Sequence, residues 1–491
     1  MIELHLLWPP GTTEPSVPFT DDRTLEDLGF PMIIDAMAAG DADIARVAKA
    51  VFVHATTDTS IIRWRQELIT DAIAHPQLVR DLARIAQHGA QMERRTAYAT
   101  RPQTPISQLL RSREILALLL ADLRSLAQRI EEPDGDVASH GLQLLFTTIG
   151  DNFDSAYLNS LETELERLRF EHGLVTRAGL GPGNLTSPDL IIEAPFEGRG
   201  WRDRLALSLT SKHRIEIAPR DQAGSETLRE LRNLALGQIG VALAHGLDTI
   251  VRFFVALRDD LAWLVGSLNL RDHLSTIGVP ICFPEPTDQP WQLSFCELIE
   301  PTLALRSGQR PTPNDFLDEI AEPIVISGAN SGGKTTWLQG TAIAIVMMQA
   351  GSFVTAEQFR ASMRSGLRTF FPEDEDRELR QGRLQSELAR LAATIASLSA
   401  GGLLLMNEPL ASTNEMEASA IVTTVVAELT TRGITTIVVT HYPSVARELG
   451  AYGISLRPEV IDNGVRTHRI QASPAPKNSS AMDIYRQLGG W

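Results

Sequence analysis

A glycine-rich segment followed by a lysine and two threonines carries the clearest chemistry in this 491-residue sequence. Its spacing is Gly328-x-x-x-x-Gly333-Lys334-Thr335, between an apolar stretch and an apolar helix. Glycines permit positive φ and a close approach of the backbone to a phosphate, toward which successive N–H groups then point. Lys334 would reach the β- and γ-phosphates, and the Thr335 hydroxyl would coordinate Mg²⁺. The segment therefore predicts a site for ATP and Mg²⁺ formed by Gly328, Ala329, Asn330, Ser331, Gly332, Gly333, Lys334, Thr335 and Thr336.

A second apolar stretch, residues 403–406, predicts a buried strand that ends at Asn407 and Glu408. In ATPases with a phosphate-binding loop, an acidic residue at the first of these positions holds Mg²⁺, usually through water. The glutamate that follows can orient or deprotonate the attacking water, and Glu408 fits that role. Asn407 brings no negative charge, although Mg²⁺ favours carboxylates. The asparagine therefore predicts weaker metal binding or slower hydrolysis.

A third stretch, residues 435–440, is rich in β-branched residues and places His441 at the end of a predicted strand. A histidine at that point can sense the γ-phosphate or support the attacking water. We therefore predict catalytic roles for Glu408 and His441. The predicted metal site consists of Thr335 and, through water, Asn407.

These three stretches require a sheet to position them. Strands and helices alternate after residue 324, which predicts a mostly parallel α/β sheet. Strands and prolines first appear near Val279, so we place a domain boundary near residue 275. The predicted organisation is an N-terminal arm over residues 1–24, a helical region over residues 25–275 and a nucleotide-binding domain over residues 276–491.

The helical region has apolar residues at helical spacing. Leu158, Leu161, Leu165 and Leu168 step by three and four residues and form one apolar stripe. Packing within the protein explains such a stripe, and a coiled-coil partner is the alternative. Two long helical runs on either side of an irregular segment predict an elongated helical lever, with a compact bundle as the rival arrangement.

The charge of the chain argues against a protein that coats nucleic acid without specificity, because the net charge is −16. One segment departs from this balance. Residues 179–220 predict a small, basic, strand-containing insertion, which could contact a nucleic-acid backbone or form an ordinary solvated hairpin. The candidate DNA-contacting residues are Arg199, Arg202, Arg204, Lys212 and Arg214.

The remaining composition is that of an ordinary soluble protein, with two cysteines. Two cysteines in a chain of this length do not form a disulfide framework, so we expect a reducing compartment and a cytoplasmic protein. The N-terminus lacks the pattern of a signal peptide. The apolar run at residues 342–348 is far shorter than the roughly 20 residues of a membrane helix, so no membrane partner is expected.

Several of these segments resemble those of the MutS family of DNA mismatch-repair ATPases. Asn330 and the paired Gly332-Gly333 are more particular than the general phosphate-loop pattern, and Thr440-His441-Tyr442 is similar to the family's Thr-His-Tyr. Further segments that resemble the family are residues 25–82, 350–357, 382–388, 407–414 and 479–489.

The resemblance implies a fold of class α plus α/β, in which a helical lever precedes a P-loop ATPase domain of the ABC type. It implies a homodimer with composite nucleotide sites, where the segment with Ser386 and Glu387 reaches the nucleotide of the other subunit. Double-stranded or branched DNA is the implied ligand. The sequence departs from the family at its front, which has no room for mismatch-reading and connector domains, and at Asn407.

The leading hypothesis is an ATPase that couples nucleotide state to DNA binding or remodelling in repair or recombination, without reading mismatches itself. The alternative is a nucleotide-gated scaffold that hydrolyses ATP barely and binds protein partners through its lever. Asn407 and the acidic net charge favour the scaffold. A metabolic kinase is a weaker third hypothesis, because the sequence offers no evident pocket for an acceptor substrate.

Overall fold

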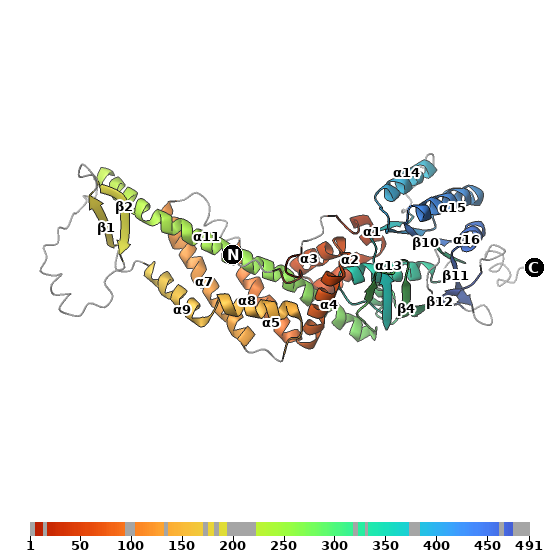
Figure 1. Cartoon of the computed structure of the whole chain (residues 1–491), viewed down its shortest axis with the longest axis horizontal. Helices are drawn as coiled ribbons and strands as arrows, with labels where there is room; N and C mark the ends of the chain where they lie inside the picture. The colour runs from red at the N-terminus through yellow and green to blue at the C-terminus, as the bar shows by residue number, and fades with distance from the viewer. Residues whose placement is uncertain are drawn as a thin grey trace, which may run out of the picture. The chain divides into compact units, whose positions relative to one another are not determined.

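The computed structural model describes residues 5–12, 17–93, 104–131, 136–169, 175–180, 186–193, 222–317, 323–328, 332–372, 383–460 and 466–474. The chain divides into two compact units. The helical unit comprises residues 1–4, 77–136 and 143–258, and the sheet unit comprises residues 5–76, 137–142 and 259–491. Helices and mixed sheets together make an α plus α/β protein, as the sequence predicts (Figure 1).

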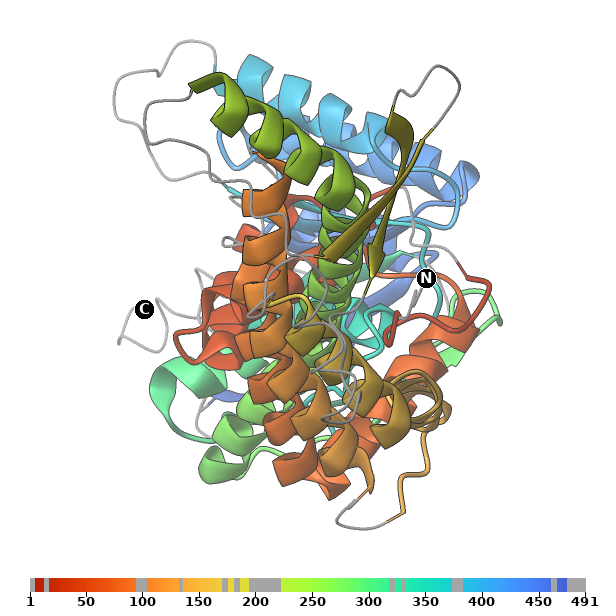
Figure 2. The same cartoon turned by 90° about the vertical axis from the view of Figure 1, so that its left-hand side faces the viewer.

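Amphipathic helices and one hairpin form the helical unit. In α9 the buried apolar residues include Leu158 and Leu165, which belong to the stripe predicted from the sequence. The hairpin of β1 and β2 is an antiparallel ribbon (Figure 2). The elements are α5 (Pro76–Ala90), α7 (Pro105–Glu131), α8 (His140–Asn152), α9 (Ser155–Arg167), β1 (Val175–Leu180), β2 (Thr186–Glu193) and the first part of α11 (Gln222–Ile277).

Helices α5 and α11 approach each other closely at a glycine. A Cβ added to Gly89 would lie 2.5 Å from Cγ of the Phe254 ring, which is fully buried. No side chain larger than that of glycine fits this position unless the ring moves. Gly150 in α8 is different, because a Cβ added there would meet nothing within 4 Å.

Four helices open the sheet unit, and three of them begin after an aspartate. Asp21, Asp41 and Asp58 each accept a hydrogen bond from a backbone N–H of the first turn. These bonds satisfy donors that a helix N-terminus would otherwise leave unpaired. The helices are α1 (Asp22–Asp27), α2 (Phe30–Ala38), α3 (Ala42–Val53) and α4 (Thr59–Ala74).

A six-stranded sheet carries all three sequence motifs. Its strand order is β12-β11-β6-β10-β9-β8, and neighbours pair in parallel except for β11 with β12. Because β10 lies between β6 and β9, the residues that follow these three strands emerge side by side at the carboxyl edge. The strands are β6 (Ile324–Ser327), β8 (Leu367–Phe370), β9 (Leu403–Asn407), β10 (Thr435–Thr440), β11 (Ile454–Val460) and β12 (Arg466–Ala472).

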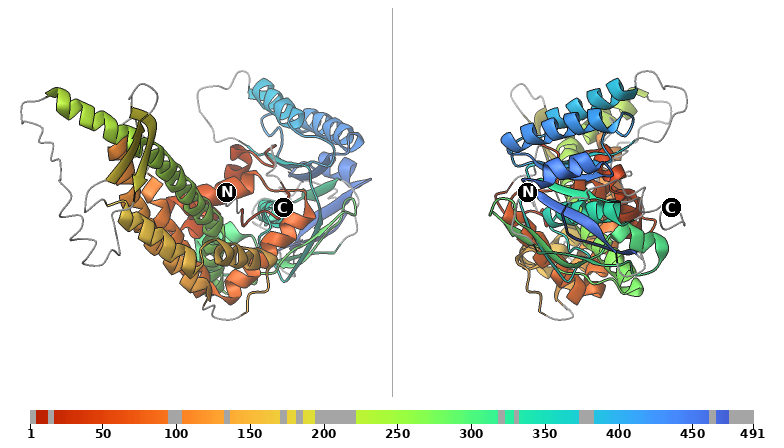
Figure 3. Two further views of the ribbon diagram at one scale, coloured as in Figure 1. Left: turned by 60° about the vertical axis from the view of Figure 1, so that its left-hand side comes forward. Right: turned by 90° about the vertical axis from the view of Figure 1, so that its right-hand side faces the viewer.

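Helices cover this sheet and bury its apolar side chains. Helix α13 (Lys334–Gln349) is buried along most of its length. Helices α14, α15 and α16 share one apolar cluster with the strands, and Figure 3 shows α14 and α15 side by side. A smaller sheet has the order β3-β7-β4-β5. The other elements are β3 (Glu285–Thr287), β4 (Leu293–Leu298), α12 (Pro301–Ser307), β5 (Asn314–Phe316), β7 (Gln358–Ser362), α14 (Arg383–Ala396), α15 (Glu415–Thr431) and α16 (Pro443–Gly450).

The first described residues of the chain pack into the sheet unit. Leu6 and Leu7 are buried, and the Leu6 N–H donates to the carboxylate of Asp260 in α11 at 2.7 Å. Burial raises the pKa of Asp260 to about 7. Within the predicted N-terminal arm, Leu6, Leu7 and Phe19 are therefore buried, whereas Val17 is 73% exposed.

One stretch among the described helices could cross a membrane by length and composition alone. It is Ile239–Ile277 within α11, whose most apolar 18-residue window has a mean hydropathy of 1.5. Core helices of soluble proteins meet the same two criteria. In this stretch the Phe254 ring packs close to Gly89, and the Trp263 ring lies 5.4 Å from that of Phe52. Phe254 and Trp263 are therefore packed within the protein, and 33% of the most apolar 18-residue window of this stretch is buried.

We predict that Gly89→Ala destabilises the protein and that Gly150→Ala does not. Alanine at residue 89 forces the buried Phe254 ring out of place, which costs about 1–3 kcal/mol. At residue 150 there is room, so the higher helix propensity of alanine adds about 0.5–1 kcal/mol. Urea unfolding of the two variants beside the wild type measures both effects. Equal stability of the two variants would contradict the close contact at Gly89.

Candidate functional site

The glycine-rich segment forms the turn between β6 and α13. Gly328 follows β6 with φ of 141°, and Gly333 precedes α13 with φ of 87°. A Cβ on Gly328 would lie 2.9 Å from Pro458 Cδ, and one on Gly333 would lie 2.9 Å from the carbonyl oxygen of His468. Both glycines are therefore required by conformation and by space, because the β11–β12 hairpin lies directly against the turn.

Lys334 is the first residue of α13, and its side chain turns back over the loop. It is 5% exposed, and its Nζ donates to the carbonyl oxygen of Gly328 at 2.8 Å. The same ammonium lies 3.9 Å from Glu408 Oε1. Together with the positive end of the α13 dipole, it favours an anion at this turn. The predicted residues Ala329, Asn330 and Ser331 lie outside the described residues.

The predicted metal ligands lie together. Thr335 Oγ1 donates to Asn407 Oδ1 at 3.3 Å. A hydroxyl and an amide oxygen are hard donors, and Mg²⁺ commonly takes few protein ligands and completes its shell with water and phosphate oxygens. This donor set fits Mg²⁺ beside a bound phosphate. In the described part of the chain no group of three or more His, Cys, Asp or Glu could hold a metal ion.

Glu408 and His441 form the most direct contact in the site. The Nδ1 atom of His441 lies 2.6 Å from Glu408 Oε2, and the backbone N–H of His441 donates to that oxygen at 3.0 Å. The hydrogen bond to Glu408 raises the pKa of His441; partial burial and Lys334 oppose this effect. Glu408 has φ of 47°, an uncommon conformation for a residue other than glycine. Strain of this kind is often found at functional sites.

The loop after Glu408 is tied to neighbouring helices. Ser412 donates to Glu387 of α14 at 2.5 Å, and Tyr442 donates through its hydroxyl to the carbonyl oxygen of Thr413 at 3.3 Å. The Tyr442 ring also lies 4.2 Å from the His441 ring. Of the two residues expected to reach another subunit, Glu387 contacts its own chain and Ser386 is exposed.

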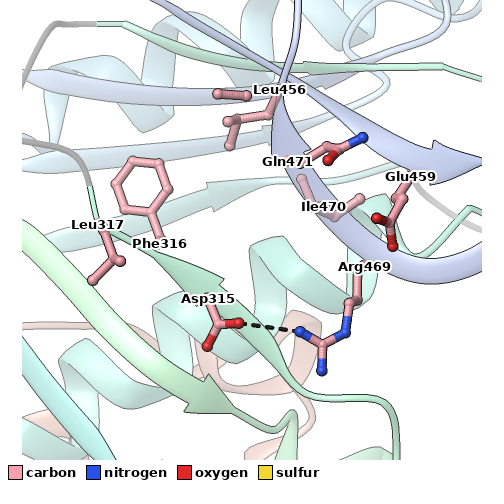
Figure 4. A pocket seen from close by; sticks show the side chains of 9 residues that line it. Asp315, Phe316, Leu317, Leu456, Glu459, Arg469, Ile470 and Gln471 are labelled. Atoms are coloured by element: carbon pink, nitrogen blue, oxygen red, sulfur yellow. Dashed lines mark hydrogen bonds and ion pairs between the residues drawn. The ribbon is translucent and has the colours of Figure 1, made fainter.

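A pocket of about 430 Å³ lies between β5 and the β11–β12 hairpin (Figure 4). Arg469 crosses its polar side and contacts Asp315 at 3.1 Å. His468, the residue before Arg469, is the one whose carbonyl approaches Gly333, so this hairpin borders both the loop and the pocket. The lining residues are Asp315, Phe316, Leu317, Leu456, Glu459, Arg469, Ile470, Gln471 and Ala472.

Sequence reasoning missed the pocket and the hairpin. No motif marks residues 466–472, and the only local signal is their alternation of polar and apolar residues, typical of a half-buried strand. The basic candidates Arg199, Arg202, Arg204, Lys212 and Arg214 lie outside the described residues. The structure therefore brings together Gly328, Gly333, Lys334, Thr335, Asn407, Glu408 and His441.

Two protein-family models match the chain. The model described as the MutS2 N-terminal domain matches residues 57–277, and the model described as MutS domain V matches residues 324–453. The second match contains the glycine-rich segment, Asn407, Glu408 and His441. The first matched region lies in the helical part of the sequence, and the second lies in the α/β part. Neither model is described as a mismatch-recognition domain.

Known proteins similar to this chain include several with the name Endonuclease MutS2. That of Streptococcus suis (strain 05ZYH33) is 24% identical over 336 residues, covering 62% of this chain and 41% of the relative. That of Geobacillus thermodenitrificans (strain NG80-2) is 31% identical over 191 residues, covering 37% of this chain and 24% of the relative. The chain thus spans less than half the length of these relatives.

We predict that the pairing of His441 with Glu408 stabilises the fold more at low pH than at high pH. A raised folded-state pKa makes this contribution fully present below the unfolded value of 6.5, and it is lost as the pH rises through the folded pKa. Because 44% of the His441 side chain is exposed, solvent screening limits the effect to less than about 1 kcal/mol.

Urea unfolding of the wild type and His441→Asn at pH 6 and pH 9 measures this contribution. The difference in unfolding free energy between the two proteins should be larger at pH 6. His273→Asn, which changes an exposed histidine of the same unit, is the control and should show no such trend. A difference that grows toward pH 9 would contradict the ion pair.

Proposed function

Because the chain belongs to the MutS family, we propose that it binds and hydrolyses ATP with Mg²⁺ and couples nucleotide state to DNA. The coupling would serve DNA binding or remodelling in repair or recombination, without mismatch reading of its own. The observation that carries this proposal is the convergence of Lys334, Thr335, Asn407, Glu408 and His441 at one edge of the parallel sheet.

Each residue of the site has a role in this proposal. Lys334 exchanges the carbonyl of Gly328 for the β- and γ-phosphates, which the N-terminus of α13 also attracts. Thr335 would hold Mg²⁺ directly and Asn407 through water, and the ion would supply positive charge to the phosphates. Glu408 orients the attacking water and accepts its proton, while His441 holds the carboxylate in place and lies near the γ-phosphate.

In this proposal the nucleoside would occupy the pocket beside the hairpin. The β12 strand leads from the carbonyl beside Gly333 directly into that pocket, so a nucleotide with its phosphates on the loop can extend there. Leu317, which lines the pocket and is 82% exposed, offers apolar surface to a flat base, and Gln471 offers donors and an acceptor to its edge.

The larger organisation follows the family. We propose a helical lever over residues 25–275 and a P-loop ATPase domain over residues 276–491, with the two joined near residue 275. The active form is a cytoplasmic homodimer, and the ligand is double-stranded or branched DNA. The basic segment 179–220, with its five Arg and Lys candidates, supplies the phosphate contacts.

A nucleotide-gated scaffold is the second candidate. It is favoured by Asn407, which contacts Thr335 through a neutral amide where a carboxylate would attract Mg²⁺ more strongly. In this case ATP binding alone would change the conformation, and the lever would contact protein partners.

ATP turnover by three proteins separates the two candidates. If the chain is an ATPase, Glu408→Ala should lower turnover roughly 100-fold or more, because the group that activates water is gone. Asn407→Asp should then raise turnover by less than about tenfold, because the wild type already hydrolyses ATP without the carboxylate. Slow wild-type turnover that rises more than about tenfold in Asn407→Asp would support the scaffold. Binding of a fluorescent ATP analogue by each variant controls for lost affinity, and Lys334→Ala should abolish that binding.

DNA binding is tested by filter binding of plain, branched and mismatched duplexes over a salt series. We expect affinity to fall as salt rises, with no preference for mismatches. The triple change Arg199, Arg202 and Arg204 to Gln should reduce the slope of log affinity against log salt by about 3, since each phosphate contact contributes about 0.9.

A charge-matched control completes this experiment. Changing Arg63, Arg432 and Arg447 to Gln alters the net charge equally at three exposed positions outside the basic segment. This control should leave the slope near that of the wild type. Binding that is indifferent to salt, or absent, would rule out the DNA part of the proposal.

A further inference from the structure

The C-terminal end of α13 is held by a buried arginine from α4. Arg65 is 1% exposed, and its Nη1 donates to the carbonyl oxygen of Ala350, the residue that caps α13, at 3.1 Å. A guanidinium is favourable at the carbonyl end of a helix. A Cβ on Gly351 would lie 2.6 Å from Arg65 Cβ, so α4 passes directly against this helix end.

The same guanidinium also holds the first described residues of the chain. Its Nε donates to the carbonyl oxygen of Leu7 at 3.2 Å, and the Trp8 ring lies 4.4 Å from its Cζ. A guanidinium is planar and carries donors at fixed angles, so it can serve two carbonyls at once while one face packs on an aromatic ring. Arg65 therefore connects α13 to residues 6–8.

Residue 6 continues the connection to α11. The Leu6 N–H donates to Asp260 at 2.7 Å, and its carbonyl oxygen accepts from the Trp64 indole N–H at 2.7 Å. Leu6 and Asp260 are both buried. A continuous set of buried contacts thus runs from Ala350 through Arg65 and residues 6–7 to Asp260.

We propose that Arg65 and residues 6–8 form a latch, which positions α13 and transmits its nucleotide-dependent movement to α11 at Asp260. The inference rests on the proposed function, because it requires a nucleotide at the opposite end of α13. That helix has 16 residues and is about 24 Å long. Because α13 is buried along most of its length, it should move as one body. A displacement of its N-terminal end at Lys334 would then also displace Ala350, which Arg65 contacts.

Arg65 is in this view a positioning residue, which acts on the nucleotide site through α13. Its contacts also stabilise the fold, so a loss of stability alone does not test the latch. The distinguishing property is a response at residues 6 and 7 to a nucleotide bound at the other end of the helix. Amide hydrogen exchange measures that response without depending on turnover.

The experiment compares hydrogen exchange of residues 5–12 and 259–277 with and without ATP and Mg²⁺, in the full chain carrying Glu408→Ala to prevent hydrolysis. In this background we expect nucleotide to change exchange at Leu6 and Leu7 by about fivefold or more. Adding Arg65→Lys keeps the positive charge but removes the planar guanidinium, whose donors contact the carbonyl oxygens of Leu7 and Ala350. It should leave binding of a fluorescent ATP analogue intact and abolish the exchange response.

Two further variants make the outcome decisive. Arg46→Lys is the matched control. Arg46 of α3 forms an exposed ion pair with Asp259 of α11 at 2.6 Å, and it is not part of the latch. This variant should keep the response. If Arg65→Lys does not fold, Trp64→Phe keeps an aromatic ring but removes the indole N–H that holds Leu6 and part of the ring, and it should weaken the response.

The outcomes separate the two proposals. Nucleotide that binds but leaves exchange at Leu6 and Leu7 unchanged would overturn the latch and leave the proposed function standing. A response retained in Arg65→Lys, or lost equally in Arg46→Lys, would also overturn it. Failure of the parent protein to bind nucleotide would overturn the proposed function and, with it, the latch.

Discussion

The parallel pairing of β10 with both β6 and β9 is the interaction on which the candidate site depends. Its register sets Thr440 opposite Ser327 and Val439 opposite Asn407. The glycine-rich segment, Glu408 and His441 each follow directly from one of these three strand ends. Because the strand side chains alternate between faces, a slip of one residue would turn the site residues away from each other. The buried apolar side chains of these strands, held by helices on the sheet, keep the register fixed.

Local patterns in the sequence were sufficient for much of this arrangement. The glycine spacing requires a turn, the apolar runs at residues 403–406 and 435–440 give buried strands, and parallel strands gather their carboxyl ends at one edge. The approach of Glu408 to His441 follows from these facts. Other features depend on residues far apart in the chain, which no local period reveals. The hydrogen bond between Arg65 and Ala350 joins residues 285 positions apart, and the β11–β12 hairpin meets the loop through the backbone of His468.

The electrostatics of the site centre on one carboxylate between two basic groups. Glu408 faces the Lys334 ammonium with one oxygen and the His441 ring with the other. An aspartate at residue 407 would add a second negative charge beside Thr335, whereas Asn407 leaves the amide oxygen alone to contact the hydroxyl. The charges of these side chains therefore favour binding of an anion at the loop more than binding of a divalent cation. In the proposed function, nucleotide affinity and hydrolysis rate would therefore be separable quantities.

The order in which the two units occur along the chain has a consequence for biosynthesis. Residues 77–136 and 143–258 of the helical unit are inserted between segments of the sheet unit. On the ribosome the helical unit is complete once residue 258 has emerged, but Leu6 and Leu7 must wait for Asp260, and β6 must wait for β10. At about 5–20 residues per second, the stretch from residue 260 to residue 440 takes roughly 10–40 s to synthesise. For that time the apolar N-terminal helices of the sheet unit have no completed core to enter, so the nascent chain presents a substrate for chaperones.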